Sequence, residues 1–134
     1  MKKTLLSFIC LFFALFSTAH AYSPYSYLLR SGTYQLSGGN TKWNGGAYQG
    51  EVVIQPQGEN YSVVWFIGSS QAQIGVGILE NDILSVAFQD LSNATVGVVS
   101  FRIVADGELE GKWTSLDGYS QKPEYLVWKS YFTY

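Results

Sequence analysis

Carboxylates and aromatic rings are the side chains from which this chain could build a reactive or binding site. Its only histidine, His20, and its only cysteine, Cys10, both lie within the first 21 residues. A basic start, an apolar run over 5–16 and a small-residue cleavage site at 19–21 predict that residues 1–21 are a secretory signal peptide. After cleavage, the ligand sets of zinc and haem, the Ser-His-Asp triad and the thiol nucleophile are all absent. Carboxylate, Tyr, Lys or Arg chemistry remains, or binding without catalysis.

Glu124 is the carboxylate with the clearest signal in the sequence. Leu126 and Trp128 share one face of a predicted strand over 123–129. If these two residues face the interior, Glu124 does too, and an inward carboxylate must be paired, hydrogen-bonded or protonated. The alternative is a residue at the rim, in contact with water. An enzyme that uses Glu124 together with a tyrosine is the least favoured function.

Aromatic residues recur on the predicted inner faces of the strands, where they could line a cavity for an apolar or planar ligand. The alternative is that these rings form the solid core of a small domain. Trp43 is different, because it lies in the glycine-rich loop 37–46, where a large ring either covers one end of the core or is offered to a partner. The candidate ligand-binding residues are Trp43, Tyr48, Trp65, Phe101, Trp113 and Glu124, with Trp128 as a further inward ring.

The elements that must position these residues are β-strands. Between Thr95 and Thr114, apolar and polar residues alternate on both sides of a central turn. A three-residue loop, 105–107, brings the apolar residues of both strands to one face, with Gly107 at the position that requires a left-handed backbone. The expected pairs are Ile103 with Leu109, Phe101 with Gly111 and Val99 with Trp113.

Two further hairpins follow from the same alternation. A four-residue loop over 56–59 is expected to pair Ile54 with Tyr61. A three-residue loop over 80–82 is expected to pair Ile78 with Leu84, and it turns Ile74, Val76 and Ile78 inward. In the strand 60–68 the second face is also apolar, through Val64 and Phe66, so that face is either covered or borders an interface.

The predicted fold is all-β, an antiparallel up-and-down meander of eight strands that closes, or nearly closes, into a barrel. A two-sheet β-sandwich is the alternative. Such a barrel leaves an interior that is filled by side chains or holds one small ligand. Besides the two strands of 95–114, the expected strands are 30–36, 47–55, 60–68, 72–79, 83–88 and 123–129.

The predicted mature chain is a single domain, residues 22–134, with a loosely ordered lead-in at 22–29. It is expected to be secreted or periplasmic, without a transmembrane anchor, because the apolar run of the signal peptide is too short to remain as one. Since no cysteine is left, stability must come from a core rich in aromatic residues, which make up 16% of the sequence. We expect no cofactor and no bound metal.

Cleavage leaves six of the eight Lys and Arg residues and all ten Asp and Glu residues. The six basic residues are scattered along the chain, which argues against nucleic acid as a partner. The leading hypothesis is therefore an exported, non-catalytic binding module that engages an extracellular or envelope protein, or a small apolar ligand, through its loops or its lumen. The alternative is a periplasmic inhibitor or envelope-assembly partner that presents the loop 37–46.

A resemblance supports this fold. The order of the segments GTY at 32–34, AYQGEVVI at 47–54, YSVVWFIG at 61–68 and DGELEGKW at 106–113, with GVGIL and LSVAF between the last two, resembles a family of small exported bacterial β domains, sometimes labelled fibronectin-binding. The resemblance covers most of residues 22–134 and implies the fold and export. The Gly-x-Trp at 111–113 is also similar to that of lipocalin and avidin barrels, although lipocalins carry theirs on the first strand.

Overall fold

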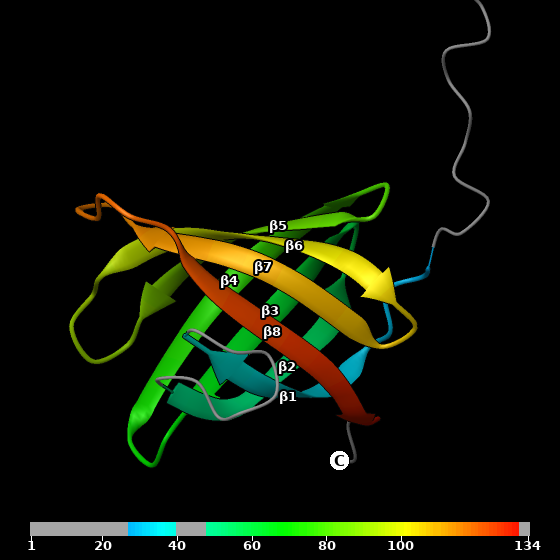
Figure 1. The fold of residues 1–134 in the computed structure, drawn as a ribbon, viewed down its shortest axis with the longest axis horizontal. Helices are drawn as coiled ribbons and strands as arrows, with labels where there is room; N and C mark the ends of the chain where they lie inside the picture. The colour runs from blue at the N-terminus through cyan, green and yellow to red at the C-terminus, as the bar shows by residue number, and fades with distance from the viewer. Residues whose placement is uncertain (1–26, 40–47, 132–134) are drawn as a thin grey trace, which may run out of the picture.

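The protein is a closed β-barrel of eight strands, each antiparallel to its neighbours in the chain, with β1 paired to β8 (Figure 1). The structure is a computed structural model that describes residues 27–39 and 48–131. The strands are β1 (Gly32–Gly38), β2 (Tyr48–Gln57), β3 (Asn60–Ile67), β4 (Gln71–Glu80), β5 (Ile83–Asp90), β6 (Val96–Ala105), β7 (Glu108–Ser115) and β8 (Lys122–Ser130). The up-and-down barrel is confirmed over the sandwich.

The barrel closes because alternate side chains of successive strands converge on one interior, which buries an apolar core without leaving a sheet edge. The positions of all eight strands agree with the sequence prediction to within a few residues at each end. The largest fully buried side chains are Trp65, Tyr34 and Phe101. Around them pack Leu36, Val52, Ile54, Val63, Leu84, Val86, Phe88, Val99, Ile103, Leu109 and Leu126.

The hairpin of β6 and β7 has the predicted register. Ile103 pairs with Leu109, Phe101 with Gly111 and Val99 with Trp113. The register is reached through a bulge between Ile103 and Ala105, which leaves Asp106 and Gly107 at the turn. Gly107 has a φ of 74°, the left-handed conformation that its position required.

The predicted turn between β2 and β3 is wrong in length. Pro56 pairs with Tyr61, and Gln57 with Asn60, so the loop has two residues in place of four. Gly58 takes the first position of this loop with a φ of 61°, where glycine suits a tight hairpin turn. Ile54 therefore pairs with Val63. The error is two residues, an even number, so the apolar face of each strand stays inside.

The predicted turn between β4 and β5 is wrong by one residue, and the consequence is larger. Leu79 pairs with Leu84, so the loop consists of two residues, of which Asn81 has a φ of 56°. A one-residue shift turns every side chain of a strand to its other face. The residues expected inside, Ile74, Val76 and Ile78, therefore lie on the outer surface and are exposed.

The inner face of β4 carries small residues instead. A Cβ on Gly75 would lie 2.7 Å from the Ala87 carbonyl oxygen and 3.1 Å from the Trp65 ring, and one on Gly77 would lie 2.9 Å from Leu84. These glycines give β4 the close approach that the large rings of β3 and the aliphatic residues of β5 require. The inward side of β4 thus makes room for the core, and its outward side is apolar.

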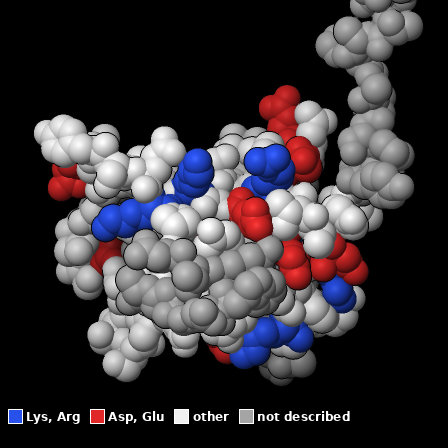
Figure 2. Space-filling view, in the orientation of Figure 1, with Lys and Arg blue, Asp and Glu red and all other residues white. Residues whose placement is uncertain are grey.

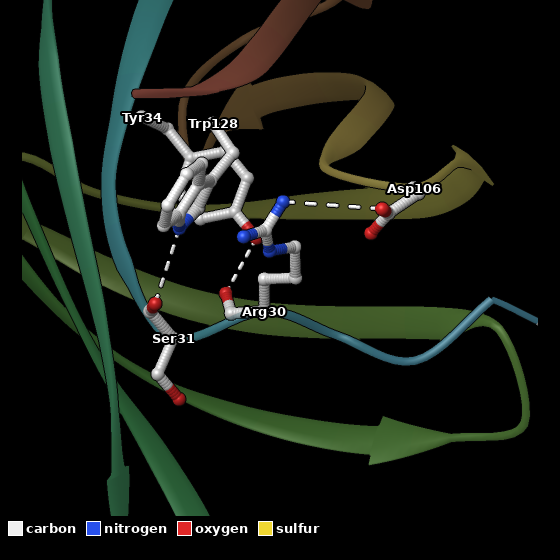
Figure 3. Close-up of polar contacts among 5 residues, drawn as sticks. All are labelled: Arg30, Ser31, Tyr34, Asp106 and Trp128. Atoms are coloured by element: carbon white, nitrogen blue, oxygen red, sulfur yellow. Dashed lines mark hydrogen bonds and ion pairs between the residues drawn. The ribbon is translucent and has the colours of Figure 1, made fainter. Parts of the chain in front are cut away.

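One end of the barrel is closed by an aromatic cluster, which Figure 3 shows. The Arg30 guanidinium lies over the Trp128 ring, 3.6 Å from its centroid, and the Trp128 indole donates a hydrogen bond of 3.1 Å to the Ser31 carbonyl. The Tyr34 hydroxyl donates to the Arg30 carbonyl, and burial raises the pKa of Tyr34 to about 12. Trp128 is therefore structural, at the end of the barrel opposite the cavity described below.

The predicted signal peptide and residues 22–26 of the predicted lead-in lie outside the described residues. Of the remaining lead-in, Leu28 is exposed, whereas Leu29 packs against the core. Within 27–39 and 48–131, no helix is long and apolar enough to cross a membrane.

Candidate functional site

A cavity of about 470 Å³ opens at the end of the barrel away from the Arg30 and Trp128 cluster. It lies where β1, β3, β5 and β7 end and β2, β4, β6 and β8 begin. These strand ends point toward the left in Figure 1. Its volume is in the range of small-molecule sites. Its walls are formed by Gly39, Tyr48, Trp65, Ile67, Gln71, Gln73, Phe88, Trp113, Lys122, Pro123 and Glu124.

Glu124 lies in the wall of this cavity with only 5% of its surface exposed. The Trp65 indole donates a hydrogen bond of 2.6 Å to Glu124 Oε1, and the Tyr48 hydroxyl donates one of 3.1 Å to Oε2. The Trp113 indole in turn donates a 2.8 Å bond to the Tyr48 hydroxyl oxygen. Four side chains from β2, β3, β7 and β8 thus form one connected network. The alternative that placed Glu124 at the rim, in contact with water, is wrong.

Glycines on both neighbouring strands make space for aromatic rings next to Glu124. In the barrel wall, Glu124 pairs with Gly38 of β1 on one side and with Gly111 of β7 on the other. A Cβ on Gly38 would overlap the Tyr48 ring, and a Cβ on Gly111 would lie 2.5 Å from the Phe101 ring. The rings of the neighbouring strands therefore lie across the glycines, which brings Tyr48 within reach of the carboxylate.

Burial raises the pKa of both Glu124 and Tyr48. Desolvation raises the pKa of Glu124 from its ordinary 4.5 to about 7, although the hydrogen bonds from Trp65 and Tyr48 stabilise the ionised form. Desolvation, reinforced by the Glu124 charge, also raises the pKa of Tyr48 far above its usual range. Tyr48 is consequently a neutral hydroxyl at any ordinary pH, whereas Glu124 can change charge near neutrality.

The two indole N–H groups and the Tyr48 hydroxyl all donate hydrogen bonds within the network. Deep in the cavity, the group of the network that can still form a hydrogen bond to a ligand is therefore an acceptor. Glu124 is hydrogen-bonded once at each oxygen and keeps further lone pairs. Donors are found at the rim, where the exposed Lys122 ammonium lies 5.3 Å from the centroid of the Trp113 ring. Phe88 completes the apolar wall, 5.7 Å from Trp65 and 6.3 Å from Trp113 between ring centroids.

A second buried carboxylate, Asp90, holds two side chains of the cavity wall in place. Gln71 and Gln73, which line the cavity, donate to Asp90 Oδ2 at 2.7 and 3.3 Å. The hydroxyl and the backbone N–H of Ser92 donate to Oδ1, as does the backbone N–H of Asn93. These bonds, those from Ser92 foremost, lower the pKa of Asp90 well below its usual range. The sequence analysis missed Asp90, and its only signal there was an acid two residues before a Ser-Asn pair.

We expect Asp90→Asn to destabilise the protein by about 1–2 kcal/mol at pH 7. The asparagine amide would place an N–H group where the glutamine side chains need an acceptor. The lowered pKa of Asp90 contributes stability above its unfolded pKa, near 4, and this contribution is lost as the pH falls. The difference between the two proteins should therefore shrink between pH 4 and pH 2 in urea unfolding. Asp106→Asn is the control, since the Asp106 ion pair with Arg30 spans 3.9 Å on the surface and should contribute little. A loss at pH 2 as large as at pH 7 would contradict this role for Asp90.

The structure brings together four of the residues singled out from the sequence, namely Tyr48, Trp65, Trp113 and Glu124. Phe101 is fully buried in the core and does not line the cavity. Trp43 lies outside the described residues. Lining residues that the sequence analysis did not select are Phe88, Gln71, Gln73 and Lys122. Phe88 shares the inward face of Leu84 by strand alternation, but nothing in the pattern showed at which depth it would lie.

The described residues include no group of three or more His, Cys, Asp or Glu side chains arranged to hold a metal ion. The fold and the cavity together define an eight-stranded up-and-down β-barrel with an aromatic pocket and a buried carboxylate at one end. Comparison with protein-family models and with curated proteins gave no match for this chain.

Proposed function

We propose that this protein is an exported, non-catalytic binding module that holds a small ligand in the cavity beside Glu124. The observation that carries the proposal is the buried Glu124, held by Trp65 and Tyr48 in the wall of an aromatic cavity. A carboxylate is costly to bury. A cavity that retains one beside apolar rings suits a ligand with an apolar body and a polar group placed to meet the carboxylate.

The chemistry of the cavity walls narrows the class of ligand further. Because the indole and phenol donors are used internally, the group that meets Glu124 should itself be a donor, such as an amine, amidinium or amide N–H. A cation there would also lie against aromatic ring faces, which attract positive charge. At the rim, Lys122 suits an acceptor at the outer end of the ligand. We therefore favour a small aromatic or aliphatic amine, with or without an acceptor at its far end.

Binding is favoured over catalysis by the state of the tyrosine. A tyrosine that acts as nucleophile or base needs a lowered pKa, whereas burial and the Glu124 charge raise that of Tyr48. The carboxylate is engaged on both oxygens, and the described residues place no second carboxylate in the cavity wall. Glu124 thus recognises a charge or a donor more readily than it transfers a proton.

Three probes of matched shape test the proposal: 2-phenylethylamine, 2-phenylethanol and 3-phenylpropionate, each followed by tryptophan fluorescence, since Trp65 and Trp113 line the cavity. We expect the amine to bind best. Its affinity should rise about tenfold or more from pH 5.5 to pH 8, because Glu124 ionises through its pKa of about 7. 2-Phenylethanol should bind weakly with little pH dependence, and 3-phenylpropionate should bind most weakly of the three.

Two variants separate specific binding from surface adsorption. Glu124→Gln should remove the preference for the amine over the alcohol, and Glu59→Gln, in the exposed turn between β2 and β3, should leave it unchanged. Absence of binding by all three probes at millimolar concentration would count against a ligand site. Binding of the alcohol but not of the amine would keep the cavity as the site and reject the donor assignment.

A further inference from the structure

The outer surface of β3, β4 and β6 carries a continuous group of exposed apolar side chains. We call it the outer apolar face and define it by six residues, each between 39% and 64% exposed: Phe66, Ile74, Val76, Ile78, Val96 and Val98. Strand β5 lies between β4 and β6 and adds small residues, Ser85 and Ala87. Isolated exposed apolar residues are ordinary on protein surfaces, whereas a contiguous patch of this kind marks an interaction site.

Charge is absent from this face and present elsewhere. No Lys, Arg, Asp or Glu occurs between Asn60 and Leu79, and Asp90, which is buried, is the only one between Ile83 and Phe101. On the opposite wall of the barrel, Glu51 pairs with Lys129. Figure 2 shows Lys, Arg, Asp and Glu side chains spread over the face that β7 and β8 occupy in Figure 1. The barrel therefore has one charged side and one apolar side.

Closure of the barrel restricts how a partner can use this face. Because β1 pairs with β8, no strand edge is left to extend the sheet into a second chain. Association through the outer apolar face must therefore proceed by side-chain packing, face to face, as two sheets pack in a sandwich.

The shape of the face suits such packing with a copy of itself. A barrel wall is convex around the barrel, and twisting and coiling make it concave along the strands. An open groove of about 1020 Å³ runs over this face, lined by Val64, Ile74, Val76, Ala87 and Val98 among others. The end of β7 and the loop after it, with Ser115, Leu116 and Gly118, form one of its sides. A saddle-shaped surface fits an identical surface that is rotated by about 90°, the crossing angle of orthogonal sheet packing. A single two-fold axis in the plane of the interface produces this arrangement.

We propose that the outer apolar face is the interface of a two-fold symmetric homodimer. The six apolar side chains expose on the order of 500 Å², within the ~300–600 Å² range of the largest patches on monomers, and such patches are often functional. A two-fold contact buries this face on both copies, on the order of 1,000 Å² in total, which is about the smallest area of a specific interface. An uncharged surface does not repel its own copy, and a two-fold contact requires only self-complementarity.

This inference is independent of the ligand proposed above. The groove and the ligand cavity share only Phe88 among the residues that line them. A dimer that packs through β3 to β6 therefore does not use the residues of the cavity wall other than Phe88. Loss of ligand binding and loss of dimerisation can be measured separately.

Sedimentation equilibrium of the purified protein between about 1 and 100 µM tests the dimer. We expect a dimer that Val76→Lys disrupts, with a dimer dissociation constant at least about 100-fold higher, because the variant buries a charge without a partner at the centre of the interface. Thr33→Lys, which places the same charge on the outer side of β1, should leave the dimer intact. Far-ultraviolet circular dichroism shows whether each variant folds. If Val76→Lys does not fold, the smaller change Val76→Thr replaces it, with a weaker effect expected on the dimer.

A monomer across the whole concentration range would overturn the proposal, and it would mean that another occupant covers the face. A dimer that resists both Val76→Lys and Ile74→Lys would place the interface elsewhere and would also overturn it. Disruption by Val76→Lys and by Thr33→Lys alike would indicate a general charge effect and would equally count against this face.

Discussion

Glu124→Gln should make the protein more stable at pH 8, by about 1–3 kcal/mol, and should remove most of the pH dependence of its stability between pH 4.5 and pH 7.5. The cause is the raised pKa of Glu124, about 7 in the folded protein against an ordinary 4.5. Below the unfolded pKa, the carboxyl group is protonated in both states and has no effect. As the pH rises, the unfolded chain ionises first, so the folded state loses stability until Glu124 ionises as well.

The size of this effect follows from the shift. One pKa unit corresponds to about 1.4 kcal/mol, which makes roughly 3 kcal/mol an upper limit for a side chain as buried as Glu124. Glutamine keeps an oxygen that accepts from Trp65, but its amide nitrogen turns a donor toward Tyr48, which reduces the gain.

Urea unfolding of both proteins at half-unit steps from pH 4 to pH 8.5 measures this effect. The profile of the wild type should fall with pH and level off above about pH 7.5, and that of Glu124→Gln should be nearly flat over this range. Glu59→Gln, in an exposed turn, should follow the wild type. Parallel profiles for the wild type and Glu124→Gln would show that Glu124 is not a buried, titrating group.

Trp65→Phe should destabilise the protein by about 3–4 kcal/mol at pH 8 and by clearly less at pH 5. Trp65 is only 1% exposed, and its indole makes the shortest bond to Glu124, 2.6 Å to Oε1. At pH 8 the variant loses both core volume and the donor to an ionised, buried carboxylate. At pH 5 the carboxyl group is protonated, and mainly the loss of packing remains. Without the indole donor, the pKa of Glu124 should rise above 7.

A double-mutant cycle separates the two contributions. In a Glu124→Gln background, the cost of Trp65→Phe should be lower at pH 8 and nearly independent of pH, with a coupling of about 1–2 kcal/mol between the two sites. A cost that is the same in both backgrounds would show that Trp65 acts through packing alone. Trp128→Phe at the closed end, whose indole donates to the Ser31 carbonyl, is a matched control that should show no coupling to Glu124.

Much of the candidate site was visible in the sequence, because strand alternation assigns side chains to a face. Tyr48, Trp65, Trp113 and Glu124 were expected on one inner surface, and they lie together in the wall of the cavity. Alternation does not show depth along the barrel. Phe101 and Trp128 share the inward face with these residues, yet one lies in the core and the other at the opposite end. Asp90 and the glutamines that it binds were not found, since their bonds join side chains of β4 to the last residue of β5.

The sequence analysis missed the outer apolar face because it made the turn between β4 and β5 one residue too long. From the sequence of β4, either of its faces could be the inward one. Isoleucine and valine on one side, or glycine on the other, can each face a core. The neighbouring strands decide which face points inward, because the Trp65 ring of β3 needs the space beside Gly75, and Leu84 of β5 needs the space beside Gly77. Packing thus decided the register, and the register placed three large apolar residues outside.

Sequence alone determined the class of the fold, because the two-residue period and the short turns act locally, between residues that are close in the chain. It also determined the kinds of chemistry open to residues 22–134, since that depends on residue types. The protonation of Glu124 and the shape of both surfaces were decided only by the tertiary structure. Burial, charge and packing depend on groups brought together from distant parts of the chain, such as Trp65 and Glu124, and no local pattern records those distances.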